Sequence, residues 1–392
     1  MHLTTPHTIL LFTCLTALSL TAHANNKTLP SKGFLYQSDN GNIKLKMGGR
    51  LHLDGAIFNE DKTALENDWM VRRARISLRA DLFNDWRISA QYNVSGDDTP
   101  FQSASIRYSG FHKTHLTAGQ IQEPFSLEET TSSNNYTFME RSLANAFSPG
   151  YNVGFSISQW GNNWGFSAGT FWETYIEDSD LFPQDGAKGF SGRLTFTTYR
   201  DHNTILHFGG SASYRKPDAD QKLRIRTQPE SDVTTETFVS TGRMRNVDSQ
   251  MIHGIEAVLA TGPVTLQGEY IATRVSRFED KQDETFDGGY LSASWLINGR
   301  QRSYSTRSGS FGAVKVGRGQ NVWEVAIRRS FIDLNSGTGT ITGGKQTNTT
   351  FALNWYQNKN VRVMLNYINI DTDQEAGDDD PSILQMRWQM VM

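Results

Sequence analysis

Side chains along residues 69–80 alternate between apolar and polar at every second position. One face carries Met70, Ala74, Ile76, Leu78 and Ala80, and the other carries Arg73, Arg75, Ser77 and Arg79. A period of two predicts a β-strand with two chemically opposite faces, as in any half-exposed strand of a soluble sheet. Because unpaired guanidinium groups are costly to bury, we expect the arginine face to meet water, anions or carboxylates. Arg72 breaks the alternation, and a cation there could extend to a lipid headgroup region.

The same two-faced pattern recurs along the chain with turn residues between its copies. It is clearest in residues 86–94, 164–172, 206–214, 264–272, 349–356 and 361–368. Each segment has an apolar face, often with an aromatic residue near one end, and a small or polar face. We predict roughly fifteen to seventeen antiparallel strands between Ile43 and Met392, with sixteen favoured by the even strand numbers of bacterial barrels. A large soluble sandwich or propeller would give the same alternation.

The last strand continues the pattern to the end of the chain. Its apolar face carries Leu384, Met386, Trp388, Met390 and Met392, opposite Gln385, Arg387 and Gln389. This segment resembles the terminal recognition strand of outer-membrane barrels, although those usually end in an aromatic residue. We therefore predict an all-β fold, a transmembrane antiparallel β-barrel with apolar residues facing lipid.

The amino terminus predicts export. An apolar run from Ile9 to Leu20 is too short to span a bilayer, and Ala22-His23-Ala24 fits a small-residue cleavage pattern. We expect residues 1–24 to be a cleaved signal peptide, residues 25–42 an N-terminal periplasmic segment, and residues 43–392 the barrel. Cleavage would remove Cys14, the single cysteine, so the mature chain has no disulfide.

Composition narrows the class of protein. Only 37% of residues are hydrophobic, the mean hydropathy is −0.51, and no stretch approaches the roughly 20 apolar residues of a membrane helix. Aromatic residues are plentiful, and 34 Gly accompany 10 Pro, a balance that suits strands and tight turns. A net charge of −3 gives no support for nucleic-acid binding. No nucleophile elbow or metal-ligand spacing occurs, so we expect no enzyme activity, cofactor or metal.

Ordered motifs in the middle of the chain carry a family resemblance. They are Gly119–Glu128, Thr131–Ser133, Thr137–Arg141 and Ala146–Gly150, with further matches at 224–226, 229–231, 268–270, 294–299, 332–334 and 354–356. Together with the tract at 72–75, these segments look like those of the phosphate-selective porin O and P family. The resemblance spans nearly the whole mature chain.

This resemblance implies a sixteen-stranded outer-membrane barrel, a homotrimer, with a constriction loop folded into the lumen. The matching loop is about residues 120–146, with constriction residues Glu123, Pro124, Phe125, Ser126, Glu128, Ser132 and Ser133. An external loop with no role in conductance is the alternative. The implied partners are outer-membrane lipid, lipopolysaccharide, the barrel-assembly machinery and small anions.

Arginine spacing predicts how anions would cross such a barrel. Arg73, Arg75 and Arg79 on one strand, and Arg224 and Arg226 on another, have the two-residue spacing that gives about 7 Å between neighbours. Several weak cationic sites in series favour passage of small anions, with phosphate and polyphosphate as candidates. In the alternative, these arginines are consumed by lumen carboxylates, with Glu256, Glu269 and Glu324 as candidates.

Departures from the family pattern favour anions in general over phosphate alone. Relatives often have lysine where this chain has Gln122, and Tyr151-Asn152 stand where relatives tend to be basic.

Acidic tracts at 279–287 and 371–380 are predicted to be solvated loops, with divalent-cation binding as the alternative. An outer-membrane hydrolase and a surface adhesin with a closed barrel are the rival functions.

Overall fold

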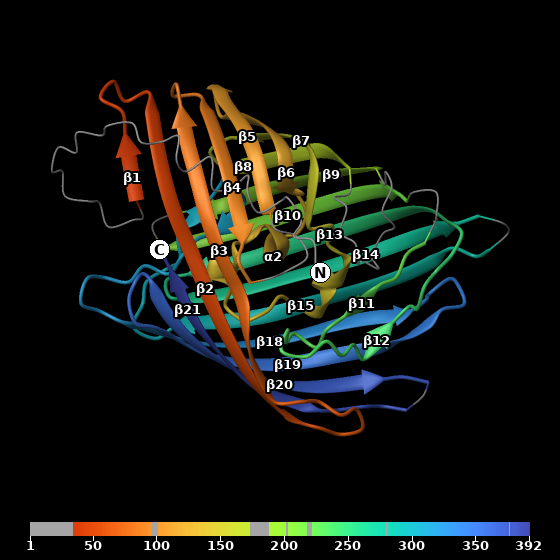
Figure 1. Ribbon diagram of the computed structural model, residues 1–392. Helices are drawn as coiled ribbons and strands as arrows, with labels where there is room; N and C mark the ends of the chain where they lie inside the picture. The colour runs from red at the N-terminus through yellow and green to blue at the C-terminus, as the bar shows by residue number, and fades with distance from the viewer. Residues whose placement is uncertain are drawn as a thin grey trace, which may run out of the picture.

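The computed structural model describes residues 34–95, 101–172, 188–200, 203–217, 222–278, 281–375 and 377–392. The predicted signal peptide, residues 1–24, lies outside them, as does the start of the predicted N-terminal segment. Sixteen strands form one closed antiparallel barrel, as predicted, in which each strand pairs with its neighbour in sequence and β21 pairs with β2 (Figure 1). Closure into one barrel decides against a sandwich or propeller.

The wall strands differ in length. They are β2 (Ile43–Asn59), β3 (Asp68–Leu82), β4 (Trp86–Asn93), β5 (Phe101–Phe111), β6 (Thr114–Gln122), β7 (Tyr151–Trp160), β8 (Trp164–Trp172), β9 (Lys188–Arg200), β10 (Thr204–Lys216), β13 (Val247–Thr261), β14 (Val264–Arg277), β15 (Glu284–Leu296), β18 (Val322–Asn335), β19 (Thr342–Tyr356), β20 (Val361–Asp373) and β21 (Ser382–Val391). Strand β1 (Phe34–Gln37) pairs with the first residues of β2, beyond the part that β21 covers. Strands β4 to β8 have only 8, 11, 9, 10 and 9 residues, so one side of the wall is low.

The two faces of the last strand lie as the sequence predicts. Leu384, Met386 and Trp388 are exposed on the outside of the barrel, while Gln385 and Arg387 are buried on the inside. Apolar side chains also face outward from β3, β4 and β7. No helix in the described parts of the chain is long and apolar enough to cross a membrane.

A β-bulge in β3 corrects the prediction at one point. The register between β2 and β3 shifts where His52 pairs with Arg73 and Leu53 pairs with Val71, which leaves Arg72 as the extra residue. A bulge places two consecutive side chains on the same face. Arg72 and Arg73 therefore both point into the lumen, and Val71, in place of the predicted Met70, lies on the outside.

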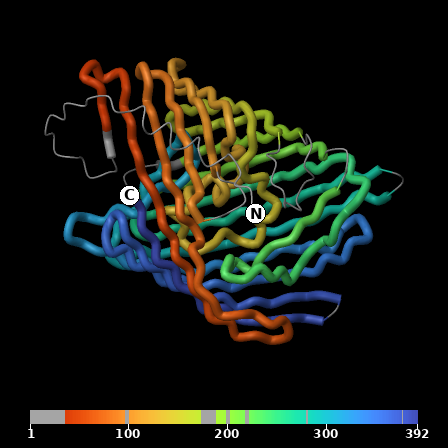
Figure 2. The backbone as a smooth tube through the Cα atoms, in the orientation of Figure 1, coloured from red at the N-terminus to blue at the C-terminus, as the bar shows by residue number. Residues whose placement is uncertain are grey.

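Three segments between wall strands fold into the lumen and pack against the inner face of the wall. Figure 2 shows the first of them, the loop between β6 and β7, inside the barrel. The loop between β6 and β7, residues 123–150, contains α2 (Leu127–Thr130), η2 (Ser133–Asn135) and η3 (Leu143–Phe147). The segment between β10 and β13 contains β11 (Arg226–Thr227) and β12 (Val239–Ser240). The segment between β15 and β18, residues 297–321, contains β16 (Tyr304–Ser305) and β17 (Ser310–Phe311).

An apolar core inside the barrel holds these segments. Phe125 and Phe147 of the loop pack with Leu223 of the second segment and with inward-facing Ile252 and Phe286 of the wall. Leu127 packs similarly with Val258 and Phe311. The lumen face of β13 to β18 is therefore partly apolar, contrary to the small or polar face that we predicted. This packing leaves the open space on the side of β2 to β9.

Candidate functional site

Two cavities occupy the open side of the lumen. The first, of about 650 Å³, is lined by Arg50 and Arg75 of the wall together with the loop 123–150 and residues 226–232. The second, of about 420 Å³, is lined by Arg107 of β5, by Arg307 and by serines of β4, β5, β7 and β8. The same four residues line both: Gln91, Gln122, Thr130 and Tyr151. The cavities therefore meet at a neck of amide and hydroxyl groups.

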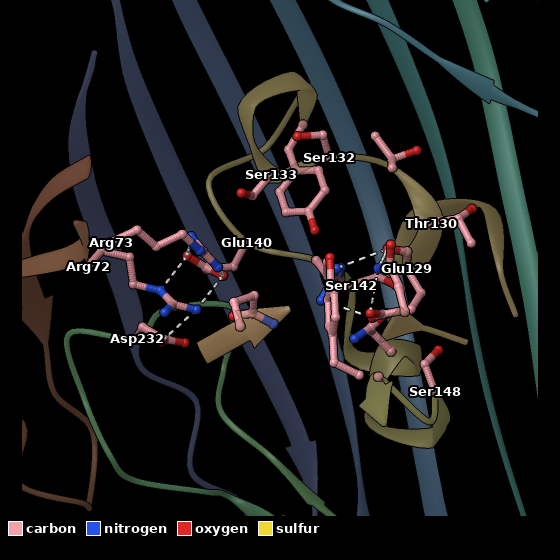
Figure 3. A pocket seen from close by; sticks show the side chains of 18 of the residues that line it. Arg72, Arg73, Glu129, Thr130, Ser132, Ser133, Glu140, Ser142, Ser148 and Asp232 are labelled. Atoms are coloured by element: carbon pink, nitrogen blue, oxygen red, sulfur yellow. Dashed lines mark hydrogen bonds and ion pairs between the residues drawn. The ribbon is translucent and has the colours of Figure 1, made fainter. Parts of the chain in front are cut away.

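Arg73 anchors the loop. Arg72 Nε lies 3.0 Å and Arg73 Nη2 lies 3.2 Å from the Glu140 carboxylate (Figure 3). Arg387 also contacts this carboxylate. The other acids of this cluster are Asp232, 2.7 Å from Arg72, and Asp54, 2.6 Å from Arg387. Burial raises the pKa of Glu140, but the three guanidinium groups outweigh it and hold that pKa well below its usual range. Arg73 thus joins the loop to the wall.

Arg75 differs from Arg73 although it lies only two residues further along β3. It lies directly opposite Arg50 of β2 in the register. Arg50 donates to Ser133 Oγ at 2.7 Å and to Gln91 Oε1 at 2.9 Å. Within the described residues neither arginine has a carboxylate partner, and Arg75 Nε has no hydrogen-bond partner. Two adjacent cations without counter-charges are unfavourable in an empty site.

Arg79, the third arginine of the predicted row, is less closely paired than Arg73 but has a carboxylate nearby, unlike Arg75. Its Nε lies 3.6 Å from Asp81, which also accepts a hydrogen bond from Arg87 Nε at 2.5 Å. One carboxylate is therefore shared by two guanidinium groups. This cluster keeps a surplus positive charge on the lumen side of β3 and β4.

The structure corrects the predicted location of Arg224 and Arg226. They belong to the in-folded segment between β10 and β13 and not to a wall strand. Arg224 Nε donates to Ser240 Oγ at 3.2 Å, while Arg226 lines the first cavity. A regular arginine ladder on this second strand is thus absent.

Most of the predicted constriction residues hold the loop in place. Glu123 pairs with Arg215 and accepts from Asn152 Nδ2 at 2.7 Å, and Phe125 is fully buried in the apolar core. Ser126 Oγ caps α2 by accepting from Glu129 N at 3.1 Å. Glu128 pairs with Arg328 at 3.0 Å. Three predicted residues line a cavity and have no such anchoring role: Ser132 and Ser133 line the first cavity, and Pro124 lines the second, beside Glu123. The loop extends to Gly150, four residues beyond the predicted end.

The carboxylates predicted to neutralise the arginine row are engaged elsewhere. Glu256 pairs with Arg193 at 2.5 Å, and Glu324 pairs with Arg302 at 2.7 Å. Glu269 accepts the backbone N–H groups of Leu127 and Glu128 at 2.8 and 2.7 Å, which fixes the start of α2. These three acids therefore stabilise the wall and the in-folded segments, and none of them pairs with Arg75.

Sequence reasoning missed the cations of the second cavity. Arg107 donates to Thr117 Oγ1 at 3.3 Å, and the Arg307 guanidinium lies 5.8 Å from the centre of the Trp160 ring. Neither has a carboxylate partner in the described chain. Arg107 alternates with Ser103 and Ser105, and this alternation could have predicted its lumen position from the sequence. No local pattern marks Arg307, because it reaches the lumen on an in-folded turn.

Solved structures share this fold. OmpT, an outer membrane protein of Vibrio cholerae, superposes with a TM-score of 0.59 at 9% identity, covering 91% of this chain and 99% of that one. The anion-selective porin from Comamonas acidovorans gives 0.56 at 13% identity, covering 89% and 100%. The outer membrane channel DcaP of Acinetobacter baumannii gives 0.56 at 10% identity, covering 92% and 100%.

Sequence comparisons extend the likeness beyond the fold. Porin O of Pseudomonas aeruginosa is 25% identical over 397 residues, which cover 89% of this chain and 88% of that protein. Residues 45–392 match the family described as phosphate-selective porin O and P, that is, the barrel without the first two residues of β2. The ordered motifs, the closed barrel and the in-folded loop all agree with this match. This chain belongs to the phosphate-selective porin O and P family.

Proposed function

We propose that this porin of the outer membrane lets small anions diffuse through the two cavities. The observation that carries the proposal is a set of lumen guanidinium groups that have no carboxylate partner among the described residues, Arg50 and Arg75 in the first cavity and Arg107 and Arg307 in the second. Cationic sites in series lower the energy of an anion inside the pore, and an anion between Arg50 and Arg75 relieves their repulsion. Arg79 and Arg226 add positive potential.

Phosphate and polyphosphate belong to the anions that this path serves. Guanidinium groups pair well with phosphate oxygens and remain charged at physiological pH. The neck at Gln91, Gln122, Thr130 and Tyr151 has no charge of its own, so the strongest sites lie on either side of it. This arrangement supports passage of several anions and no exclusive phosphate site.

Ion selectivity in planar lipid bilayers tests the proposal. In a tenfold KCl gradient, the reversal potential of the purified protein should indicate chloride preference. One charge about 4 Å away in water contributes about 1 kcal/mol, so Arg75→Gln and Arg107→Gln should each reduce the anion-to-cation permeability ratio about fivefold.

A matched control separates the path from net charge. Arg274 lies 65% exposed in an ion pair with Asp283, away from both cavities, so Arg274→Gln should leave the ratio unchanged. A preference for cations would refute the proposed function. An equal effect of all three variants would show that total charge, and not the path, sets selectivity.

We further propose that the protein is exported with cleavage before Asn25 and assembles as a homotrimer. Another form of OmpT of Vibrio cholerae with this fold is described as a trimer. The short strands β4 to β8 span about 20–28 Å when tilted, and this low wall suits contact with neighbouring copies. The barrel-assembly machinery, outer-membrane lipid and lipopolysaccharide are the expected partners. Intact mass and light scattering of the purified protein test cleavage and trimer; a monomer would refute the trimer.

A further inference from the structure

The first cavity is large for an inorganic anion. Its volume of about 650 Å³ falls within the roughly 300–1,000 Å³ of pockets that bind organic ligands. Arg50 and Arg75 occupy only the part of its lining that β2 and β3 supply. An anion held between these two guanidinium groups therefore leaves most of the cavity available to the rest of a larger solute.

Three glutamines give the remaining lining an unusual polarity. Gln120 Nε2 donates to Phe101 O at 2.9 Å, Gln228 Nε2 donates to Thr234 O at 2.9 Å, and Gln122 Nε2 donates to Glu129 O. Gln122 Nε2 also donates to the carboxylate oxygen Oε1 of Glu129 at 2.8 Å. Because backbone carbonyl and carboxylate oxygens only accept, the amide nitrogen must be the atom that faces each of them. The orientation of all three amides is thereby determined.

The carbonyl oxygens of these amides are then the groups left to the cavity. No described residue donates a hydrogen bond to Oε1 of Gln120, Gln122 or Gln228, and none of these oxygens is buried. A fully ionised anion offers no proton to such an oxygen, whereas an alcohol does. The cavity thus combines donors for an anionic group at Arg50 and Arg75 with acceptors for hydroxyl groups.

We infer that the first cavity selects hydroxylated organic anions, such as sugar acids and sugar phosphates. The anionic head lies at Arg50 and Arg75, and hydroxyl groups donate to the three glutamine carbonyls. The second cavity continues this chemistry, because its serine hydroxyls both donate and accept. The inference rests on the proposed anion path and names a substrate class for it.

The test compares two six-carbon monocarboxylates of equal charge. Gluconate carries hydroxyl groups and hexanoate carries none, so block of the single-channel chloride current by each measures the contribution of the hydroxyls. Two ordinary hydrogen bonds correspond to about tenfold, so gluconate should block at about a tenfold lower concentration than hexanoate. Glucose 6-phosphate measured against inorganic phosphate gives the same comparison for a phosphate head and shows which head the arginines prefer.

Gln228→Met keeps the size of the side chain but removes the acceptor. It should reduce the ratio of the blocking concentrations of hexanoate and gluconate about threefold, while chloride conductance and block by inorganic phosphate stay unchanged. Gln120→Met provides a second variant if the first disturbs its segment. Equal block by gluconate and hexanoate, with anion preference in KCl intact, would overturn the substrate class but not the proposed pore. Cation preference in KCl would instead refute the pore itself.

Discussion

Replacing Glu140 by Gln should release the constriction loop from the wall. In the native cluster, Arg72, Arg73 and Arg387 face Asp54, Glu140 and Asp232, so the charges balance. After the substitution Arg387 keeps Asp54 and Arg72 keeps Asp232, but Arg73 loses its ion-pair partner. An unpaired buried charge costs about 3–5 kcal/mol. This cost falls on the state in which the loop is packed against the wall, so the substitution favours the released loop.

Hydrogen exchange of the loop measures this cost directly. Each 1.4 kcal/mol is a factor of about ten, so amide protection in residues 123–150 should fall by at least about a hundredfold, while wall peptides from β19 and β20 stay unchanged. The double variant Glu140→Gln with Arg73→Gln removes both charges and should restore most of the protection. Unchanged exchange in the single variant, or no recovery in the double variant, would refute the assignment of Arg73 as an anchor.

The remaining predictions concern pH, backbone and the in-folded turn. The pKa of Glu140 in the folded protein lies well below its ordinary value. The ion pairs of Glu140 therefore stabilise the packed loop at any pH above the ordinary pKa, and this stabilisation is lost only as the pH falls through the folded pKa. Open-channel noise should therefore be equal at pH 7 and about pH 4. A rise in noise centred near pH 4.3 would contradict this. A Cβ at Gly119, where φ is 124°, would lie 2.2 Å from Ala104 O, whereas one at Gly150 meets nothing within 4 Å, so Gly119→Ala should lower refolding yield much more than Gly150→Ala. Equal yields would exclude this clash. Arg302→Gln leaves Glu324 buried without its ion pair and should lower the free energy of unfolding, measured in urea, by about 3 kcal/mol. Adding Glu324→Gln should restore most of this free energy, and a double variant as unstable as Arg302→Gln would contradict the pairing.

The strand pattern could be read from the sequence because it depends on local geometry. Successive side chains of a strand point to opposite faces, so the outward Leu384, Met386 and Trp388 follow from spacing alone. The pattern fails where the backbone departs from strict alternation, as at the bulge that turns Arg72 inward. It also fails at Ile252 and Phe286, which face the lumen because in-folded segments cover them.

The site was less predictable than the barrel, since it is assembled from distant segments. Arg75 lines the first cavity, but nothing within residues 69–80 shows that Arg73 pairs with Glu140, 67 residues away. Arg307 reaches the second cavity on a turn whose sequence has no strand periodicity. The sequence also could not indicate which carboxylates would form ion pairs with other arginines and so be removed from the arginine row.

The sequence by itself determined that the chain forms many two-faced strands and that a row of arginines lies on the polar face of residues 69–80, because successive side chains alternate along the backbone of a strand. Alternation left a sandwich or propeller open, and the pairing of β21 with β2 decided for a closed barrel. The tertiary structure decided which of those arginines can act on an anion. That decision depends on the in-folded segments: Glu140 neutralises Arg73, whereas no described carboxylate approaches Arg75. The field of a guanidinium group depends on its neighbours in space, and these are set only when the loop packs against the wall.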